Sequence, residues 1–353
     1  MTNNNQQAFF ALVRAGLWEK EVRLLPYGDI DYAEVMRLAQ EQAVVGLVAA
    51  GLEHVTDVKV PQVWALQFAG QTIQLEQRNK AMNQFIADLI AKMRKAEIYT
   101  ILVKGQGIAQ CYERPLWRTS GDVDLFLSAE NFEKATSLLL PLSNGNKPEC
   151  NYSKELGYYI DSWSVELHGT QRTGLSSRVD AEIDAVQRDL FFGGKVRSWN
   201  NGETTIFLPA ADEDVFIVFT HFVKHFYKEG GVTVRQVCDW CRLLYRYCGE
   251  LDLRILESRI KSAGLMSEWK AFAKLAVDYL GMPVEAMPLY SKAEKWSKNA
   301  EKIVDFILKG GEWRKWKDTY RVGQIFPMST LKFLPGIILN VNWLKIKERL
   351  FKA

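Results

Sequence analysis

Two aspartates near the end of the segment Tyr99–Leu127 lie in a pattern that is otherwise typical of a buried strand. A largely apolar run, residues 100–103, meets Lys104-Gly105; a helix-like stretch follows, and the segment ends in DVDLFL from Asp122. Successive side chains of a strand point to opposite faces, so Asp122 and Asp124 share one face while the apolar residues enter the core. Two adjacent carboxylates repel each other unless a positive group lies between them. A divalent ion commonly fills this role, and oxygen-only ligands favour magnesium or manganese.

A second segment, Ser164–His168, has the same alternation. Val165 and Leu167 are expected in the core, which places Glu166 and His168 on the opposite face. If this strand lies beside the first, three carboxylates converge. For His168 three roles remain open: binding a metal-linked water, orienting Glu166, or capping the strand by a hydrogen bond.

These segments resemble the motifs of the nucleotidyltransferase superfamily, which includes DNA polymerase beta, kanamycin nucleotidyltransferase and the tRNA CCA-adding enzymes. The closest likeness is to a bacterial branch with the pattern LKG…R..GDIDLLV…ELH. The chain has Val103-Lys104-Gly105, then RTSGDVDLF from Arg118, then Glu166-Leu167-His168. It departs from the wider superfamily at Gln106, where serine is usual, and in the fifteen residues between Gln106 and Asp122.

The resemblance implies transfer of a nucleotidyl group from a nucleoside triphosphate to an acceptor hydroxyl or phosphate, with release of pyrophosphate. Two magnesium or manganese ions, about 3.5–4 Å apart, support such a displacement. By resemblance Asp122 and Asp124 bridge both ions, and Glu166 holds the catalytic one and draws the proton from the acceptor. A small molecule, a sugar, an RNA end and a protein side chain all remain open as acceptor.

The resemblance also indicates where the nucleotide binds. Glycine allows close backbone approach, and amides at the start of a helix attract anions. The nucleotide-binding residues expected on this basis are Lys104, Gly105, Gln106, Arg118, Ser120 and Gly121. Lys104 is either a contact to the triphosphate or a surface lysine. Arg118 either binds phosphate with its forked donors or forms an ion pair that steadies the loop.

A further polar group lies in the second half of the chain. His221 and His225 are four residues apart and share one face of a predicted helix, but position 222 is Phe, so the glutamate of a metalloprotease helix is missing. A similar pair followed by R…D occurs in the related bacterial family, here Arg235 and Asp239. These residues either contact nucleotide or acceptor in a cleft or form a buried network between helices. Cys238 and Cys241 match C-x-x-C inside a helical run and are expected in the core.

The periodicity predicts an α+β fold with a small mixed sheet flanked by helical regions. We expect an N-terminal helical cap over 1–95, a catalytic core over 96–208 and a C-terminal helical domain over 209–353. Expected strands are 98–104, 122–127, 157–161, 164–168 and 204–208. Expected helices are 7–18, 29–55, 61–96, 106–112, 131–140, 213–228, 233–248, 253–263, 267–280 and 291–309.

Charge is distributed unevenly along the 353 residues, whose formal net charge is +3. Residues 291–353 hold 14 Lys and Arg and 6 Asp and Glu, so this tail is basic. The remainder of the chain holds 31 Lys and Arg and 36 Asp and Glu, so it is acidic. The basic tail is expected to be a solvated helix face, with contact to nucleic acid or an anionic membrane surface as the alternative. No apolar run reaches the length of a membrane span, the start MTNNNQQ does not resemble a signal peptide, and five cysteines suit a reducing compartment. We therefore expect a cytoplasmic protein.

Two other functions remain open. A glycosyltransferase also uses Asp-x-Asp to hold manganese and a nucleotide-sugar, but it needs neither the Lys104-Gly105 turn nor a matched carboxylate at Glu166. A non-catalytic nucleotide-binding or scaffold protein on the same fold is the second alternative. Intact carboxylates at Asp122, Asp124 and Glu166 favour an enzyme over this alternative.

Overall fold

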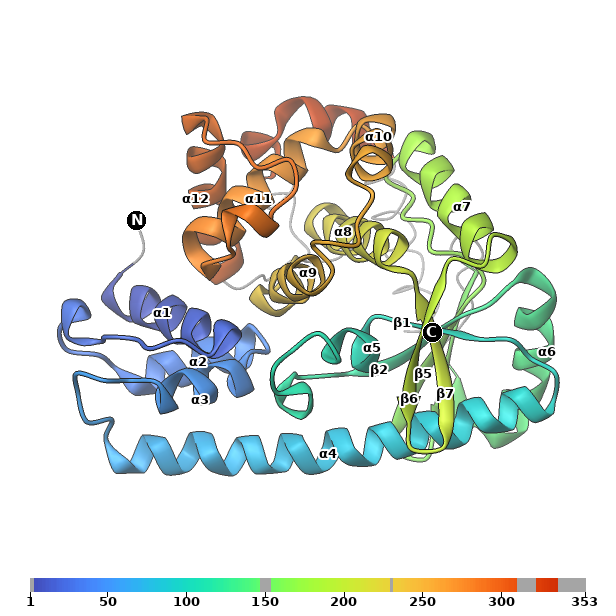
Figure 1. The fold of residues 1–353 in the computed structure, drawn as a ribbon, viewed down its shortest axis with the longest axis horizontal. Helices are drawn as coiled ribbons and strands as arrows, with labels where there is room; N and C mark the ends of the chain where they lie inside the picture. Colours follow the sequence, from blue (N-terminus) through green and yellow to red (C-terminus); the bar gives the residue numbers. More distant parts are fainter. Residues whose placement is uncertain (1–2, 147–153, 229–230, 310–321, 336–353) are drawn as a thin grey trace, which may run out of the picture.

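The computed structural model describes residues 3–146, 154–228, 231–309 and 322–335 (Figure 1). Its labelled α-helices are α1 (Asn4–Trp18), α2 (Tyr32–Glu41), α3 (Val45–Glu53), α4 (Gln62–Lys95), α5 (Gly105–Ala109), α6 (Ala129–Leu139), α7 (Ser177–Phe192), α8 (Ala211–Lys228), α9 (Val234–Arg246), α10 (Leu253–Ala263), α11 (Met266–Leu280) and α12 (Glu294–Leu308). Residues 322–325 and 327–335 are also helical. Short 3₁₀ turns are η1 (Leu25–Tyr27), η2 (Pro115–Trp117), η3 (Leu140–Leu142) and η4 (Val284–Ala286). The strands are β1 (Ile101–Val103), β2 (Asp122–Phe126), β3 (Gly145–Asn146), β4 (Glu155–Ile160), β5 (Trp163–His168), β6 (Val196–Asn201) and β7 (Thr204–Pro209).

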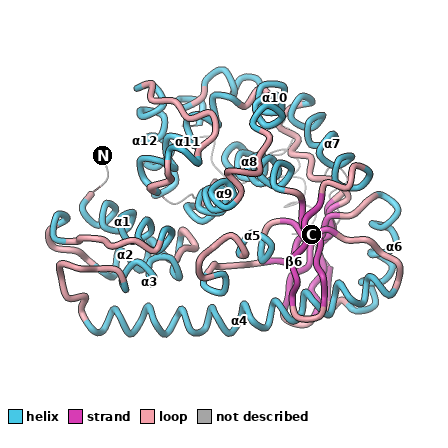
Figure 2. The backbone as a smooth tube through the Cα atoms, in the orientation of Figure 1, coloured by secondary structure: helices cyan, strands magenta, loops and turns pink. Residues whose placement is uncertain are grey.

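The strands gather at one end of the molecule, and helices make up the rest (Figure 2). The main sheet has the order β1-β2-β5-β4-β3, and β6 pairs with β7 in a separate two-stranded sheet. Strands β2 and β5 are parallel, whereas β1 with β2, β4 with β5 and β3 with β4 are antiparallel. The sheet is therefore mixed, and the α+β fold class is confirmed.

Helix α4 extends along one side of the molecule from α1–α3 to the sheet (Figure 1). It begins directly after Pro61, which suits a proline because the first amides of a helix need no partner within it. Its buried residues include Phe68 near one end and Met82, Ile86 and Ile90 nearer the other. One helix thus contributes to the cores at both ends of the molecule.

Two clusters of buried apolar side chains form these cores. The larger joins side chains of α1–α3 to those of α8–α12 and to Ile101, Val103 and Phe126 of the sheet. The smaller joins the second half of α4 to α6, β7 and the other sheet face, where Val123 and Leu125 lie. Because side chains alternate along β2, the face that carries the aspartates is the one turned away from α4.

Most predicted elements are confirmed, and the β4–β5 hairpin has the expected pairing. The single helix expected over 29–55 is wrong, because the chain breaks between α2 and α3, where Ala43 has a φ of 55°. Helix α7 and strands β3 and β6 were not expected. Helix α8 begins at Ala211, two residues before the expected start, so Asp212 lies inside its first turn. The Asp212 carboxylate accepts a hydrogen bond from the Asp252 amide.

Much of the basic tail, residues 310–321 and 336–353, lies outside the described part of the chain. The solvated helix face expected for this tail, and the alternative of contact with nucleic acid or a membrane surface, therefore stay predictions. Within the described ranges, each helix is too short or too polar to cross a bilayer.

Candidate active site

The parallel pairing of β2 with β5 places the carboxylates of the two motifs side by side. Asp124 is the register partner of Glu166, Asp122 of Ser164, and Phe126 of His168. Register partners point to the same face of a sheet, so Asp122, Asp124, Glu166 and His168 share the face turned away from α4. This convergence is what the alternation in each strand predicts for neighbouring strands.

These side chains lie in a cavity of about 340 Å³ between the sheet and helices α8 and α9. Of the residues expected in a site, those that line it are Lys104, Gly105, Arg118, Gly121, Asp122, Asp124, Glu166, His168, His221, His225, Arg235 and Asp239. Gln106 and Ser120 do not line it. The wall also includes residues that the motifs did not indicate, namely Glu155, Thr170, Gln171, Arg172, Thr173, Lys224 and Gln236.

Potential metal ligands gather tightly in this cavity. One ligand atom each from Asp124, Glu166 and His168 lie within 4.8 Å of one another. Asp122 is on the same face but is not part of this group of three. A carboxylate-rich set with a single histidine fits a hard divalent cation, for which oxygen ligands are preferred. The donor set can therefore hold a divalent cation.

Lys104 points into this group of carboxylates. Its Nζ donates to Oδ1 of Asp124 at 2.8 Å, and only 13% of its side chain is exposed. Burial disfavours the ammonium form, but the charges of Asp124 and Asp122 outweigh this effect and raise the pKa of Lys104. Lys104 therefore lies in the cavity beside the carboxylates and not on the open surface, and its contact to the triphosphate stays a prediction.

The two aspartates differ in their tendency to ionise. The negative charge of Asp124, together with burial, raises the pKa of Asp122 to about 6. Burial of Asp124 favours its neutral form, but the charge of Lys104 and the hydrogen bond from His168 outweigh it and hold the pKa of Asp124 well below its usual range. His168 Nε2 lies 2.8 Å from Asp124 Oδ1 and 4.0 Å from Glu166 Oε2. His168 therefore contacts Asp124 and lies near Glu166.

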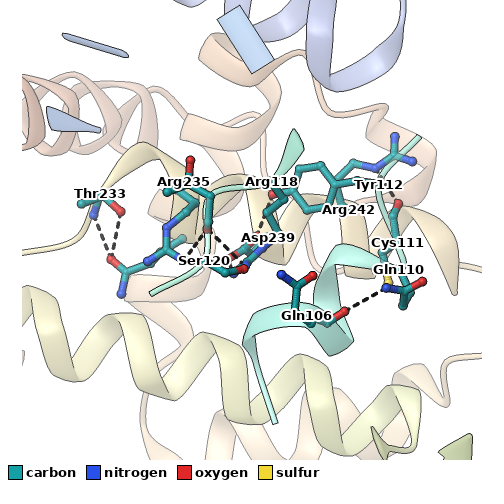
Figure 3. Close-up of polar contacts among 12 residues, drawn as sticks. Gln106, Gln110, Cys111, Tyr112, Arg118, Ser120, Thr233, Arg235, Asp239 and Arg242 are labelled. Carbon is teal, nitrogen blue, oxygen red and sulfur yellow. Dashed lines mark hydrogen bonds and ion pairs between the residues drawn. The ribbon is translucent and has the colours of Figure 1, made fainter. Parts of the chain in front are cut away.

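Arg118 and Asp239 form a buried ion pair across the edge of the cavity (Figure 3). Nε and Nη2 of Arg118 donate to the two carboxylate oxygens at 2.7 Å each, and Nη1 donates to Ser120 Oγ at 2.8 Å. Tyr112 adds a hydrogen bond from its hydroxyl to Asp239 at 2.7 Å. Of the two roles open for Arg118, this geometry supports the ion pair that steadies the loop.

Asn79 holds the same loop from the side of α4. Its Nδ2 donates to the carbonyls of Leu116 and Arg118 at 2.7 and 2.8 Å, and its Oδ1 accepts from Gln106 Nε2 at 2.9 Å. Gln106 is thus turned toward α4 instead of the cavity. Asn79 was missed, although the sequence contains a signal: it lies seven residues after Thr72 and seven before Ile86, on an otherwise buried helical stripe.

The histidines of α8 face the cavity from the helical side. Nε2 of His221 lies 3.0 Å from Nε2 of His225, so one ring donates and the other accepts. Burial and the charge of Lys104 lower the pKa of His221 well below its usual value. His221 is therefore held in the neutral form. Cys238 and Cys241 are buried, as expected for core residues.

The chain matches a known protein family. A family model described as uncharacterised nucleotidyltransferase covers residues 28–281, which is more than half of the chain and runs from the turn before α2 to the end of α11. No curated protein and no solved structure matches. The matched region includes both strand motifs and the two helices that line the cavity. On this match and the resemblance of its motifs, the chain belongs to the family of uncharacterised nucleotidyltransferases.

Proposed function

We propose that the chain transfers a nucleotidyl group from a nucleoside triphosphate to an acceptor that binds in the same cavity. The observation that carries the proposal is the register of β2 and β5, which sets Asp124 beside Glu166 with Asp122 on the same face. The reaction joins an acceptor oxygen to the α-phosphorus, breaks the bond to the bridging oxygen, and releases pyrophosphate.

Asp122, Asp124 and Glu166 would hold magnesium or manganese, with two ions as the expected number. When bound, such ions neutralise charge on the phosphates and lower the pKa of the acceptor hydroxyl. Glu166 is the residue we assign to receive the acceptor proton, at a carboxylate oxygen. His168 positions Asp124 through the 2.8 Å contact to Oδ1.

Lys104 and Gly105 are assigned to the phosphates of the donor nucleotide. The Lys104 ammonium is already in the cavity, where a phosphate oxygen can share it with Asp124. Gly105 has a φ of +43°, and a Cβ there would meet only the Asp122 carbonyl at 3.5 Å. The backbone at this point is accordingly open to close approach by a ligand.

The test is a transfer assay with purified protein, magnesium or manganese, and nucleoside triphosphates labelled at the α-phosphate. Cell extract supplies acceptors. Glu166→Gln removes one charge without changing the shape of the side chain, and we expect it to reduce transfer by at least about 100-fold. Glu155→Gln removes the same charge from the neighbouring strand β4 in the same cavity, and transfer should persist.

Each result has a distinct meaning. Label transferred by the wild type and by Glu155→Gln, but not by Glu166→Gln, supports the proposal, and the labelled species identifies the acceptor. Metal-dependent binding of a triphosphate without transfer to any acceptor would favour a non-catalytic nucleotide-binding protein. Absence of metal-dependent nucleotide binding would refute the proposal.

A further inference from the structure

Arg235, near the start of α9, is a cation in the cavity wall whose hydrogen-bonding capacity is largely unused. Its Nη1 donates to the Thr119 carbonyl at 3.3 Å. Its Nε is buried and has no hydrogen-bond partner among the described residues. A buried donor without a partner is costly, and the cost is larger for a charged group. The unused Nε is therefore available to a ligand that enters the cavity.

The charge of Arg235 is only partly offset by the neighbouring carboxylates of Asp239 and Asp122. Arg118 takes both oxygens of Asp239, and in the described ranges no ion pair involves Arg235. Burial and the positive charge of Arg118 lower the pKa of Arg235. Figure 3 shows the two arginines on either side of the same carboxylate. Two guanidinium groups thus lie beside one carboxylate, and Arg118 alone is hydrogen-bonded to it.

The backbone amides at the start of α9 do not provide this site. The amide of Val234 donates to Gln42 Oε1 at 3.1 Å, and the amide of Arg235 donates to the Gln42 carbonyl at 3.3 Å. Thr233 and Gln236 form a capping box, in which the side chain of each is hydrogen-bonded to the backbone amide of the other. Recognition at this point therefore depends on the Arg235 side chain. Lys224 of α8 lines the same cavity and adds to its positive potential.

We propose that Arg235 binds a phosphate group of the substrate, through the edge of the guanidinium formed by Nε and Nη2. This inference rests on the proposed function and assigns a residue to its substrate. The two donors of that edge match two oxygens of a phosphate, which a lysine cannot reproduce. The phosphate belongs either to the triphosphate tail of the donor or to a phosphorylated acceptor.

Calorimetric titration of the full chain with three probes tests the inference: inorganic triphosphate, inorganic phosphate, and a nucleoside triphosphate with magnesium. We expect Arg235→Gln to weaken binding of a phosphate-bearing probe about 10- to 100-fold, because one charge-assisted contact is lost. Arg235→Lys should recover only part of the affinity. Arg37→Gln is the control, because Arg37 lies on α2 outside the cavity lining and its guanidinium already donates to Glu34 and Glu41. Its affinity should stay within about twofold of the wild type.

The three probes separate the possible sources of the phosphate. Weaker binding of inorganic triphosphate and of the nucleotide assigns Arg235 to the donor. Weaker binding of inorganic phosphate with unchanged nucleotide affinity assigns it to the acceptor. Equal affinities of wild type and Arg235→Gln for all three probes would overturn the inference while leaving the proposed function intact. Arg235-dependent phosphate binding by a protein that binds no nucleotide would instead support the inference and refute the proposed function.

Thermal unfolding distinguishes binding from a purely structural role. Because the unliganded protein holds an unsatisfied buried cation, Arg235→Gln should unfold at the same or a higher temperature than the wild type. Inorganic triphosphate should raise the melting temperature of the wild type more than that of the variant. A clear fall in the melting temperature of unliganded Arg235→Gln would show that the residue serves to hold Thr119, and would overturn the inference.

Discussion

The guanidinium of Arg118 donates two hydrogen bonds of 2.7 Å to the carboxylate of Asp239, and this pair joins the loop before β2 to helix α9. Only 2% of the Arg118 side chain and 5% of the Asp239 side chain are exposed, so water solvates neither charge to a large extent. The loop leads directly into Asp122. The strand that carries two of the candidate catalytic carboxylates is therefore anchored to the helical part of the molecule.

Removal of one partner from this pair should destabilise the protein strongly. Asp239→Asn leaves the Arg118 guanidinium buried without its counter-charge, and we expect a loss of about 3–5 kcal/mol in the free energy of unfolding. Denaturant unfolding measures it. Glu294→Gln breaks an ion pair with Lys298 whose side chains are 80% and 68% exposed, and should cost less than about 0.5 kcal/mol. Similar costs for the two variants would contradict the anchoring role.

Asn79 should matter for the site as well as for stability. Asn79→Ala leaves two buried carbonyls of the loop, those of Leu116 and Arg118, without their donor, at a cost of about 1–3 kcal/mol for each. Because this loop positions Asp122, the affinity for Mn²⁺ should fall as well. Calorimetry and denaturant unfolding measure the two effects. Gln84→Ala, on an exposed position of the same helix, should change neither, and a stable Asn79→Ala with normal Mn²⁺ affinity would refute the positioning role.

Helix α3 packs against the same loop through Gly46. A Cβ at this position would lie 2.0 Å from the Trp117 carbonyl oxygen, so Gly46→Ala forces the backbone apart and should cost about 1–3 kcal/mol or more. Gly70 of α4 is the matched control, since a Cβ there meets nothing within 4 Å. Gly70→Ala should stabilise the protein by about 0.5–1 kcal/mol. Melting temperatures of the two alanine variants that shift in the same direction would contradict this account.

His221 should lower the stability of the protein at mildly acidic pH, whereas Asp122, whose pKa is raised to about 6, acts in the opposite direction. The folded-state pKa of His221 is lowered well below 6.5 by burial and by Lys104, so below about pH 6.5 the unfolded chain takes up a proton that the folded protein does not. The stability that neutral His221 contributes is therefore fully present above the pKa of this histidine in the unfolded chain. It is lost as the pH falls toward the pKa in the folded protein, by up to about 1.4 kcal/mol per pH unit. Denaturant unfolding from pH 7.5 to about pH 5 measures the slope. His221→Gln should reduce it, and an unchanged slope would show that other groups are responsible.

The central part of the site was predictable from sequence because its signals are local. Alternation within DVDLF and within SVELH places the carboxylates on one face of each strand, and register then brings Asp124 beside Glu166. Gln106 and Ser120 were expected to contact nucleotide on the strength of a motif. Their side chains are hydrogen-bonded to Asn79 and Arg118 instead, because partners distant in the chain decide where a polar side chain turns.

The remaining features depend on tertiary packing or on weak local signals. The Arg118–Asp239 pair joins residues 121 positions apart, and no spacing rule connects them. The break between α2 and α3 falls inside a continuous apolar pattern, so periodicity alone joins the two helices. Strand β6 is half-exposed and polar along most of its length, which gives a weak strand signal. Helix α7 has buried Val179, Ile183, Val186 and Leu190 at helical spacing, so its pattern was present and was missed.

Binding of Mn²⁺ by the carboxylates of β2 and β5 is the most direct test of the central claim, because it does not require knowledge of the acceptor. Electron paramagnetic resonance of Mn²⁺ titrated with protein, with and without a nucleoside triphosphate, measures the affinity. The account predicts binding by the wild type, at least about tenfold weaker binding by Glu166→Gln, and wild-type affinity in Glu155→Gln. Absence of Mn²⁺ binding by the wild type in both conditions, or equal affinity of Glu166→Gln and the wild type, would contradict it.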